Sequence, residues 1–249
     1  MRHVEATRYV TALREGGSLP GLVEGDDDGL YVVKFRGAGQ GPGALVSEVI
    51  AGELGRAIGL NVPELVVIDI APEIGHAEPD PEIKELIEAS HGTNLGMDFL
   101  PGALPFDSAG RGTIDPDEAA SVVWFDWLIT NIDRTPRNPN LLTWHGRVWL
   151  IDHGAAFFRQ HGPVPLSLTA GRPTPMLSEH VLLPHAGPLD AAADRLEEPV
   201  RRAAGAAIGS VPSEWLGPGP EAAREQFMLF LEARLESRER IRGDLMPDA

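Results

Sequence analysis

The feature that most limits the possible folds is an abrupt change of character at residue 131. The apolar run VVWFDWLIT (122–130) is followed directly by the polar loop NIDRTPRNPN (131–140). Apolar residues at helical spacing predict a helix for the run, and Asp115 followed by Pro116 predicts where that helix begins. The prolines of the loop cannot continue the helix. The loop also carries more hydrogen-bonding side chains than a turn needs, so it requires a functional explanation.

The elements on either side of this helix predict a mixed fold. The first hundred residues read mainly as short strands, with a helix over residues 44–59 and a shorter helix over residues 80–90. After the polar loop, two short strands are joined by a His-Gly turn, and the rest of the chain reads mainly as helices. The pattern predicts an α+β fold with two lobes: a small, sheet-rich lobe over residues 1–101 and a larger, mainly helical lobe over residues 102–249.

Composition excludes several classes of protein. Hydrophobic residues make up 43% of the chain, which is enough for a substantial core. The absence of cysteine excludes disulfides and a thiol nucleophile. The formal net charge of -16 disfavours nucleic acid as a main partner, because phosphate binding needs clustered basic residues. No apolar run approaches the length of a bilayer span and the N-terminus lacks a signal peptide's apolar stretch, so we expect a cytoplasmic protein that does not act at a membrane.

Lysine occurs at only two positions, Lys34 and Lys84, among 21 basic residues. Lys34 lies in the apolar strand LYVVKF, in a chain whose other basic residues are almost all arginine. From the residues alone, Lys34 could simply extend its charge to solvent from a strand edge. Because lysine's point charge and arginine's planar fork are not interchangeable, the use of lysine here is informative.

Three oxygen-bearing side chains near the polar loop indicate a magnesium site. Asp133 lies in the loop, Asn138 follows it, and Asp152 ends the apolar strand VWLI. Mg²⁺ is usually held by one or two carboxylates together with the phosphates of a nucleotide. In kinases one Asp orients or deprotonates a hydroxyl while an Asn and a second Asp hold the metal, and the kinase loop has the same spacing from Asp to Asn. The alternative is an Asx turn at a helix end. Arg134 is expected to form a local ion pair beside Asp133.

On these residues the chain resembles the HipA-like kinase family. NIDRTPRNPNLL is similar to the family's catalytic loop, which typically reads Asn-x-Asp-Arg-His-x-x-Asn, and WLIDHGAAFF is similar to its metal-binding strand end. The resemblance extends from REGGSLPGL to the C-terminal helices. It implies a two-lobed, protein-kinase-like fold that binds ATP and Mg²⁺ and transfers a phosphoryl group to a hydroxyl acceptor.

The resemblance implies catalytic roles by position. Asp133 would be the catalytic base, and Asn138 and Asp152 would be the magnesium ligands. Two departures from the usual pattern leave these side chains intact: Thr135 stands where the family often has His, and His153 stands where protein kinases have Phe. We expect His153 to lie in a turn at the surface.

The resemblance also implies a nucleotide site. Lys34 would hold the nucleotide phosphates and would pair with Glu48, although Glu53 on the same predicted helix is an alternative partner. The remaining contacts would come from a phosphate loop in REGGSLPGL and from a hinge after the strand TNLGMD. The residues concerned are Gly17, Ser18, Asp98, Phe99 and Leu100.

Substrate and partners follow less directly from the resemblance. A serine in the corresponding loop of HipA is autophosphorylated, so Ser18 is a candidate site. The chain is short for a HipA protein, and we expect it to lack the N-terminal subdomain through which such toxins meet an antitoxin. We therefore expect an ATP- and Mg²⁺-dependent Ser/Thr protein kinase able to autophosphorylate, with a protein or small-molecule hydroxyl as substrate and without nucleic acid. The alternatives are a small-molecule kinase of the same fold and a nucleotide-binding regulatory module without phosphotransfer.

A competing interpretation comes from a glycine pattern. Gly39, Gly41 and Ala44 lie between a predicted strand and a predicted helix, and Asp69 ends the next strand, which mimics a dinucleotide-binding fingerprint. Pro42 removes an N–H where that motif needs donors. The later strands are also not separated by regular helices, as a parallel sheet requires. We therefore prefer the kinase interpretation.

Overall fold

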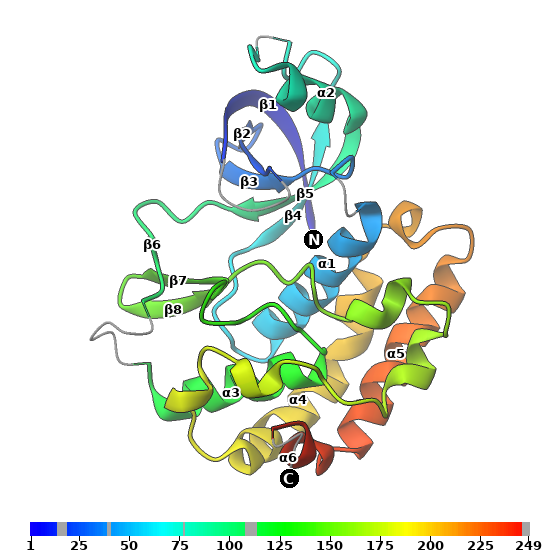
Figure 1. Ribbon diagram of the computed structural model, residues 1–249. Coiled ribbons are helices and arrows are strands. Elements are labelled where there is room, and N and C mark those ends of the chain that lie inside the picture. The colour runs from blue at the N-terminus through cyan, green and yellow to red at the C-terminus, as the bar shows by residue number, and fades with distance from the viewer. Residues whose placement is uncertain (14–18, 39–40, 77, 108–113, 246–249) are drawn as a thin grey trace. The chain divides into compact units, whose positions relative to one another are not determined.

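The structure is a computed structural model that describes residues 1–13, 19–38, 41–76, 78–107 and 114–245 (Figure 1). The fold is mixed α+β, as the sequence predicts. The chain divides into two compact units, the first made of residues 1–45 and 63–101 and the second of residues 46–62 and 102–249. Strands predominate in the first unit and helices in the second.

The first unit is built on a closed barrel (Figure 1). Its strands are β1 (Arg2–Ala12), β2 (Gly21–Gly25), β3 (Leu30–Lys34), β4 (Leu65–Ile70) and β5 (Gly92–Asp98), in the order β1-β2-β3-β5-β4. Neighbouring strands are antiparallel except β1 and β4, which are parallel. This topology is not the parallel sheet of a dinucleotide-binding fold, so the glycine pattern near residue 41 does not mark such a site.

The alternation of side chains along β3 explains where Lys34 lies. Tyr31 and Val33 are buried and belong to the core of the barrel, together with Phe35 directly after the strand. Lys34 is half-buried and lies opposite Leu95 of β5. Because successive residues of a strand point to opposite faces, the charge of Lys34 stands on the face that the barrel core does not use.

Helix α2 (Pro81–Ala89) covers part of this core. The side chain of Asp80 caps the helix by accepting a hydrogen bond from the N–H of Glu82, and Pro81 takes the first position. The buried residues of the helix, Ile83 and Ile87, belong to the same hydrophobic cluster as the inward-facing strand residues. The Asp-Pro pair therefore predicts the start of this helix correctly.

The second unit is organised around α3 (Pro116–Leu128). The side chain of Asp115 caps α3 by accepting two backbone N–H groups of its first turn, and every residue from Ala119 to Leu128 is buried. The sequence predicts one apolar face, but the helix is enclosed on all sides because it packs against α4 (Leu189–Gly209) and α5 (Pro220–Glu236). An enclosed helix gives the following loop a fixed support.

The second unit also contains a small sheet, two strands of which follow the polar loop directly. It consists of β6 (Leu104–Pro105), β7 (Leu141–Trp144) and β8 (Arg147–Leu150). His145 (φ 48) and Gly146 (φ 73) join β7 to β8, and two successive positive φ angles are what a type I′ hairpin turn requires. The predicted hairpin is confirmed, and its register pairs Leu141 with Leu150.

The remaining elements of the second unit are helical. Helix α1 (Gly41–Ala57) belongs to this unit from residue 46 onward, and α6 (Arg240–Leu245) follows α5. Short 3₁₀ turns occupy Phe158–His161, Leu166–Thr169, Leu177–Glu179, Leu183–His185 and Ser213–Leu216.

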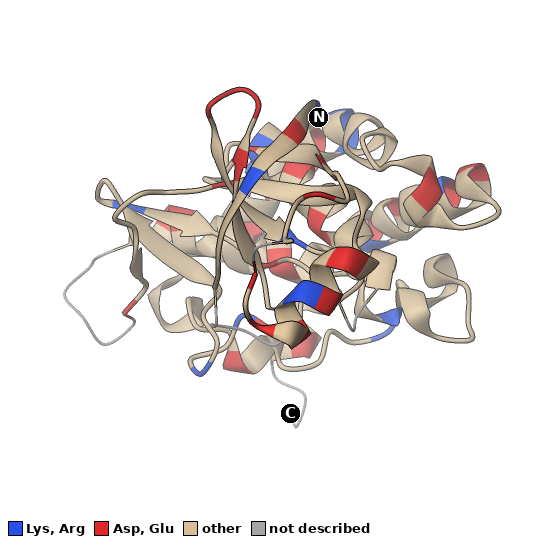
Figure 2. Ribbon diagram, turned by 90° about the horizontal axis from the view of Figure 1, so that it is seen from above, with Lys and Arg blue, Asp and Glu red and all other residues tan. Residues whose placement is uncertain are grey.

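Acidic and basic residues are scattered along the ribbon (Figure 2). Many of the exposed ones form ion pairs, such as Arg238 with Asp194 (2.8 Å) and Glu197 (3.1 Å). Pairs of this kind contribute little to stability because water screens them. Within the described ranges, no helix is long and apolar enough to cross a membrane.

Candidate active site

The polar loop leaves α3 through a tight helix end. The N–H of Asn131 donates to the carbonyl of Asp126 (2.8 Å), and the N–H of Thr130 donates to the carbonyl of Trp127 (3.2 Å). This pattern is a Schellman cap, which needs one left-handed residue, and here that residue is Thr130 (φ 49) instead of glycine. A β-branched residue in that conformation is strained, and its buried surroundings hold it there. The loop therefore starts in a fixed direction.

Asp133 is held by amide groups from three sides. Its Oδ2 accepts hydrogen bonds from the side-chain N–H groups of Asn138 (2.8 Å) and Asn140 (3.2 Å). Its backbone N–H donates to Oδ1 of Asn131 (3.2 Å), which is an Asx turn. The Asx turn thus exists, but it accounts for only one of these contacts. The asparagines fix the position of one half-buried carboxylate.

Asn138 is placed by a tight turn within the loop. The backbones of Thr135 and Asn138 exchange two hydrogen bonds from N–H to carbonyl, each 3.1 Å long. Because Nδ2 of Asn138 donates to Asp133, its Oδ1 lies on the other side of the amide and is the atom that could bind a metal. Thr135, at the position where the family often has His, therefore helps to form the turn that orients Asn138.

Asp152 follows β8 with a left-handed backbone conformation (φ 55), which is uncommon for a residue other than glycine. The N–H of Ile151 donates to the carbonyl of Asn140 (3.1 Å), which extends the pairing of β7 with β8 beyond the strands. The hairpin register therefore brings Asp152 to the end of the polar loop. Unusual backbone conformations cluster at functional sites, which agrees with the predicted role of Asp152 as a metal ligand.

Arg134 forms an ion pair, but its partner is not the neighbouring Asp133. The Arg134 side chain is buried, and its Nε donates to Oδ2 of Asp126 on α3. Burial by itself would raise the pKa of the Asp126 carboxyl, but the Arg134 guanidinium and a hydrogen bond from His180 outweigh it and hold that pKa below its ordinary value.

Neither Asp126 nor His180 is singled out by the sequence analysis. For Asp126 a signal exists, because a lone carboxylate inside the apolar run VVWFDWLIT needs a buried partner. For His180 no local pattern marks the residue.

The prediction that His153 lies at the surface is wrong, because its side chain is fully buried. Glu48 of α1 is also fully buried, and its Oε2 lies 3.9 Å from Nδ1 of His153. Since His153 directly follows Asp152, this contact connects α1 with the predicted metal-binding turn. Glu53, the alternative partner for Lys34, is only half-buried. The pairing of Glu48 with Lys34 stays a prediction.

The predicted hinge begins at the end of β5. The N–H of Asp98 donates to the carbonyl of Glu64 (2.8 Å), and the N–H of Phe99 donates to the carbonyl of Leu30 (2.9 Å). Both donors are thus used inside the first unit. The contacts of Asp98, Phe99 and Leu100 with adenine stay predictions.

The predicted site residues fall into groups by unit. Those in the second unit are Glu48, Asp133, Asn138 and Asp152. Asn138 donates to Asp133, and the bond from Ile151 to Asn140 brings the neighbouring Asp152 to the end of the loop. Those in the first unit are Lys34, Asp98, Phe99 and Leu100. Gly17 and Ser18 lie outside the described residues.

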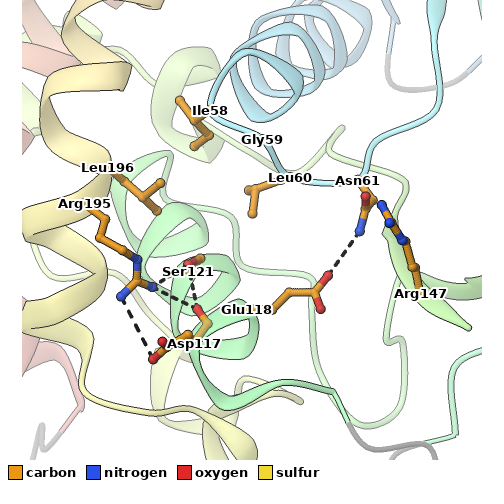
Figure 3. A pocket seen from close by; sticks show the side chains of 10 residues that line it. All are labelled: Ile58, Gly59, Leu60, Asn61, Asp117, Glu118, Ser121, Arg147, Arg195 and Leu196. Carbon is orange, nitrogen blue, oxygen red and sulfur yellow. Dashed lines mark hydrogen bonds and ion pairs between the residues drawn. The ribbon is translucent and has the colours of Figure 1, made fainter.

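A cavity of about 520 Å³ lies elsewhere in the second unit (Figure 3). On one side Arg195 donates to the hydroxyl of Ser121 (3.0 Å) and the carbonyl of Asp117 (3.1 Å), and on the other Glu118 accepts from Asn61 (3.1 Å). The other lining residues are Ile58, Gly59, Leu60, Arg147 and Leu196. No predicted site residue lines this cavity, so the cavity is not part of the candidate active site at the polar loop.

Comparison with known proteins decides the family. A model described as HipA-like kinase matches residues 7–239. The chain belongs to the HipA-like kinase family. This finding confirms the resemblance carried by the polar loop, and it makes the protein a kinase-type phosphotransferase.

Solved structures support the fold of this HipA-like kinase. The chain is similar to the Helicobacter pylori proinflammatory kinase CtkA, with a TM-score of 0.54 and 13% sequence identity over 92% of this chain and 94% of that chain. At such low identity the likeness bears on the fold alone. No curated protein matches the chain.

Proposed function

We propose that this HipA-like kinase transfers the γ-phosphoryl group of ATP, with Mg²⁺, to a Ser or Thr hydroxyl of a protein. The observation that carries the proposal is the Asp133 carboxylate, fixed by the amides of Asn138 and Asn140 at the end of an enclosed helix. A carboxylate held in this way can orient a hydroxyl and accept its proton as the phosphoryl group is transferred.

The donor atoms near the loop fit magnesium bound together with a nucleotide. Asn138 and Asp152 offer hard oxygen donors, whereas the described part of the chain holds no cluster of three or more His, Asp or Glu side chains suited to a metal. Mg²⁺ keeps several waters and completes its coordination with phosphate oxygens, so a few protein ligands suffice. When bound, the ion would neutralise charge on the phosphates. The chain's own part is to hold Asp133 and the metal ligands in fixed positions.

The nucleotide contacts proposed for the first unit rest on residue chemistry. Lys34 would place a compact positive charge on the phosphates, with Glu48 as its proposed partner. The backbone near Asp98 and Leu100 would contact the adenine, as the family resemblance implies. The N–H of Phe99 already donates to the carbonyl of Leu30 (2.9 Å) and does not take part.

A transfer assay tests the proposal. Purified protein is incubated with γ-labelled ATP and Mg²⁺, alone, with a Ser/Thr peptide library and with small alcohols, and free phosphate is measured in parallel. The proposal predicts label on Ser or Thr of the protein or the peptides. Label only on a small alcohol would indicate a small-molecule kinase. Binding of ATP without any transfer would indicate a regulatory module.

Ser18 is the proposed site of autophosphorylation, on the strength of the family resemblance. Ser18→Ala is expected to lower the phosphate content of protein incubated with ATP, as measured by intact mass and phosphopeptide mapping. Ser213→Ala, a substitution in a short turn of the second unit, is the matched control. Unchanged phosphate content in Ser18→Ala would contradict the assignment.

A further inference from the structure

Three buried side chains that take no direct part in the proposed reaction converge behind the polar loop. They are Asp126 of α3, Arg134 of the loop and His180 from the segment before α4, and each is at most 4% exposed. Nε of Arg134 donates to Oδ2 of Asp126, and Nε2 of His180 lies 2.9 Å from the same oxygen. The side-chain amide of Asn131 donates to the other carboxylate oxygen (3.0 Å). One buried carboxylate thus joins the loop to a distant segment of the chain.

The hydrogen bonds of His180 indicate its tautomer. Nδ1 accepts a hydrogen bond from the N–H of Leu182 (3.1 Å), so the ring proton is on Nε2 and points to Asp126. The N–H of the intervening Val181 donates to the carbonyl of Arg134 (3.0 Å). This segment is therefore fastened to the loop twice, through its backbone and through the Asp126 carboxylate.

Arg134 also contacts the backbone next to the proposed catalytic residue Asp133 and next to the proposed metal ligand Asp152. Its Nη1 donates to the carbonyl of Asn140, whose side chain binds the Asp133 carboxylate (3.2 Å). The same Nη1 lies 3.5 Å from the carbonyl of Ile151, the residue before Asp152. One planar guanidinium therefore contacts α3, the end of the loop and the start of the metal-binding turn. A lysine ammonium cannot reproduce this fork of donors.

We propose that Asp126, Arg134 and His180 are positioning residues that hold Asp133 and Asp152 in register for phosphoryl transfer. This inference rests on the proposed function of Asp133 and Asp152. A displacement of about 1 Å at reacting groups can lower a rate about 10²-fold, so a support that never touches the substrate still controls turnover. Arg134 and Asp126 are a buried ion pair, so removal of either one leaves the charge of the other without compensation. Removal of His180 leaves the Asp126 carboxylate with one hydrogen-bond donor fewer.

The test compares turnover per binding site in variants of the network. Arg134→Lys and His180→Leu are assayed for transfer from γ-labelled ATP, and each rate is divided by the concentration of sites that bind MgATP. We expect kcat per site to fall about 10- to 100-fold, with a much smaller change in KM for ATP. His180→Gln keeps an N–H donor near the position of Nε2, so it is expected to restore most of the rate. Unchanged kcat per site in Arg134→Lys and His180→Leu would overturn the proposal.

Arg224 of α5 offers a control in the same unit. It is half-buried and donates to the carbonyl of Val211 (3.0 Å) and the hydroxyl of Ser213 (2.9 Å), so these partners lie outside the 131–140 loop and outside the cap of α3. Arg224→Lys is expected to lower Tm but to leave kcat per site near the wild-type value. An equal fall of kcat per site in both variants would assign the effect to general loss of packing and overturn the proposal.

Failure of the proposed function would give a different result. If the wild-type protein transfers no phosphate to any acceptor tested, the proposed function fails. Hydrogen exchange then still tests whether Arg134 holds the loop in position, without any measurement of activity. The backbone amides of residues 131–140 are then expected to exchange faster in Arg134→Lys than in Arg224→Lys. Equal exchange in the two variants would overturn the positioning role.

Discussion

At the scale of single residues, two carboxylates near the loop have different surroundings, and we propose a different role for each. Asp133 is half-buried and bound by neutral amides, which leaves it suited to meet a substrate hydroxyl. Asp126 is fully buried and satisfied by Arg134, Asn131 and His180, which suits it to support and not to chemistry. The environment of each carboxylate, and not its residue type, indicates its role.

The low pKa of Asp126 makes stability depend on pH. Because folding lowers this pKa, the ion pair stabilises the folded state fully above the unfolded value of about 4, and its contribution is lost as the pH falls through the folded value. Asp126→Asn is expected to lower the free energy of unfolding by about 3–5 kcal/mol at neutral pH. The difference from wild type should shrink progressively as the solution is acidified below the unfolded value.

Urea unfolding measured across the acidic range checks this expectation. Asp28→Asn is the matched control, since it removes the same charge from an exposed hairpin turn and should change stability little at any pH. A difference between Asp126→Asn and wild type that stays constant on acidification would contradict the assigned role of the carboxylate.

The sequence predicted the local arrangement of the candidate site, but not the contacts that tertiary packing adds to it. Asp133, Asn138 and Asp152 stand out because their spacing within a loop and hairpin is itself the pattern. The partner of Arg134 could not be read in this way, because the sequence offers Asp133 beside it while packing brings Asp126. His180, 54 residues from Asp126, reaches the loop only through the folding of the second unit.

At the scale of elements, the sequence predicts a helix start or a turn correctly where specific residue types mark it. The two Asp-Pro helix starts and the His-Gly hairpin turn are found where the sequence places them. Closure of the barrel by parallel pairing of β1 with β4 joins strands that are distant in sequence, and no local pattern marks that pairing. The enclosure of α3 on all sides likewise depends on α4 and α5, which come much later in the chain.

Two glycines provide a matched test of the helix geometry. Gly205 lies inside α4, is exposed and has open space where a Cβ would stand, so Gly205→Ala should raise the free energy of unfolding by about 0.5–1 kcal/mol. Gly59, after α1, also has open space but has a φ of +89°. Gly59→Ala should therefore lower stability by about 1 kcal/mol or more. Denaturant unfolding of both variants measures the change in the free energy of unfolding. A change in the same direction for both variants would contradict the backbone conformations of Gly205 and Gly59.

At the scale of the whole molecule, the proposed binding of ATP is expected to stabilise the folded state, because the nucleotide would bind only the folded protein. A ligand that binds only the folded state, at about 100 times its Kd, adds about 2.7 kcal/mol. For a chain of this length we expect a rise in Tm of about 5–10 °C with ATP and Mg²⁺. Thermal unfolding followed by a dye or by calorimetry measures the shift.

Two controls make that shift specific to the metal site. Chelation of Mg²⁺ with EDTA should remove most of the rise in Tm, and Asp152→Asn should do so with Mg²⁺ present, because each takes away part of the proposed metal coordination. Asp28→Asn should keep the full shift. A rise of the same size with EDTA would contradict a magnesium-dependent nucleotide site.

The most direct test of the central claim is the rate of γ-phosphoryl transfer from ATP by Asp133→Asn, measured beside wild type at saturating MgATP. Asparagine keeps the size of the side chain but cannot act as a base, so the account predicts a rate about 10²–10⁴-fold lower while MgATP is still bound. A rate close to that of wild type, with MgATP bound equally well, would show that Asp133 is not the catalytic carboxylate.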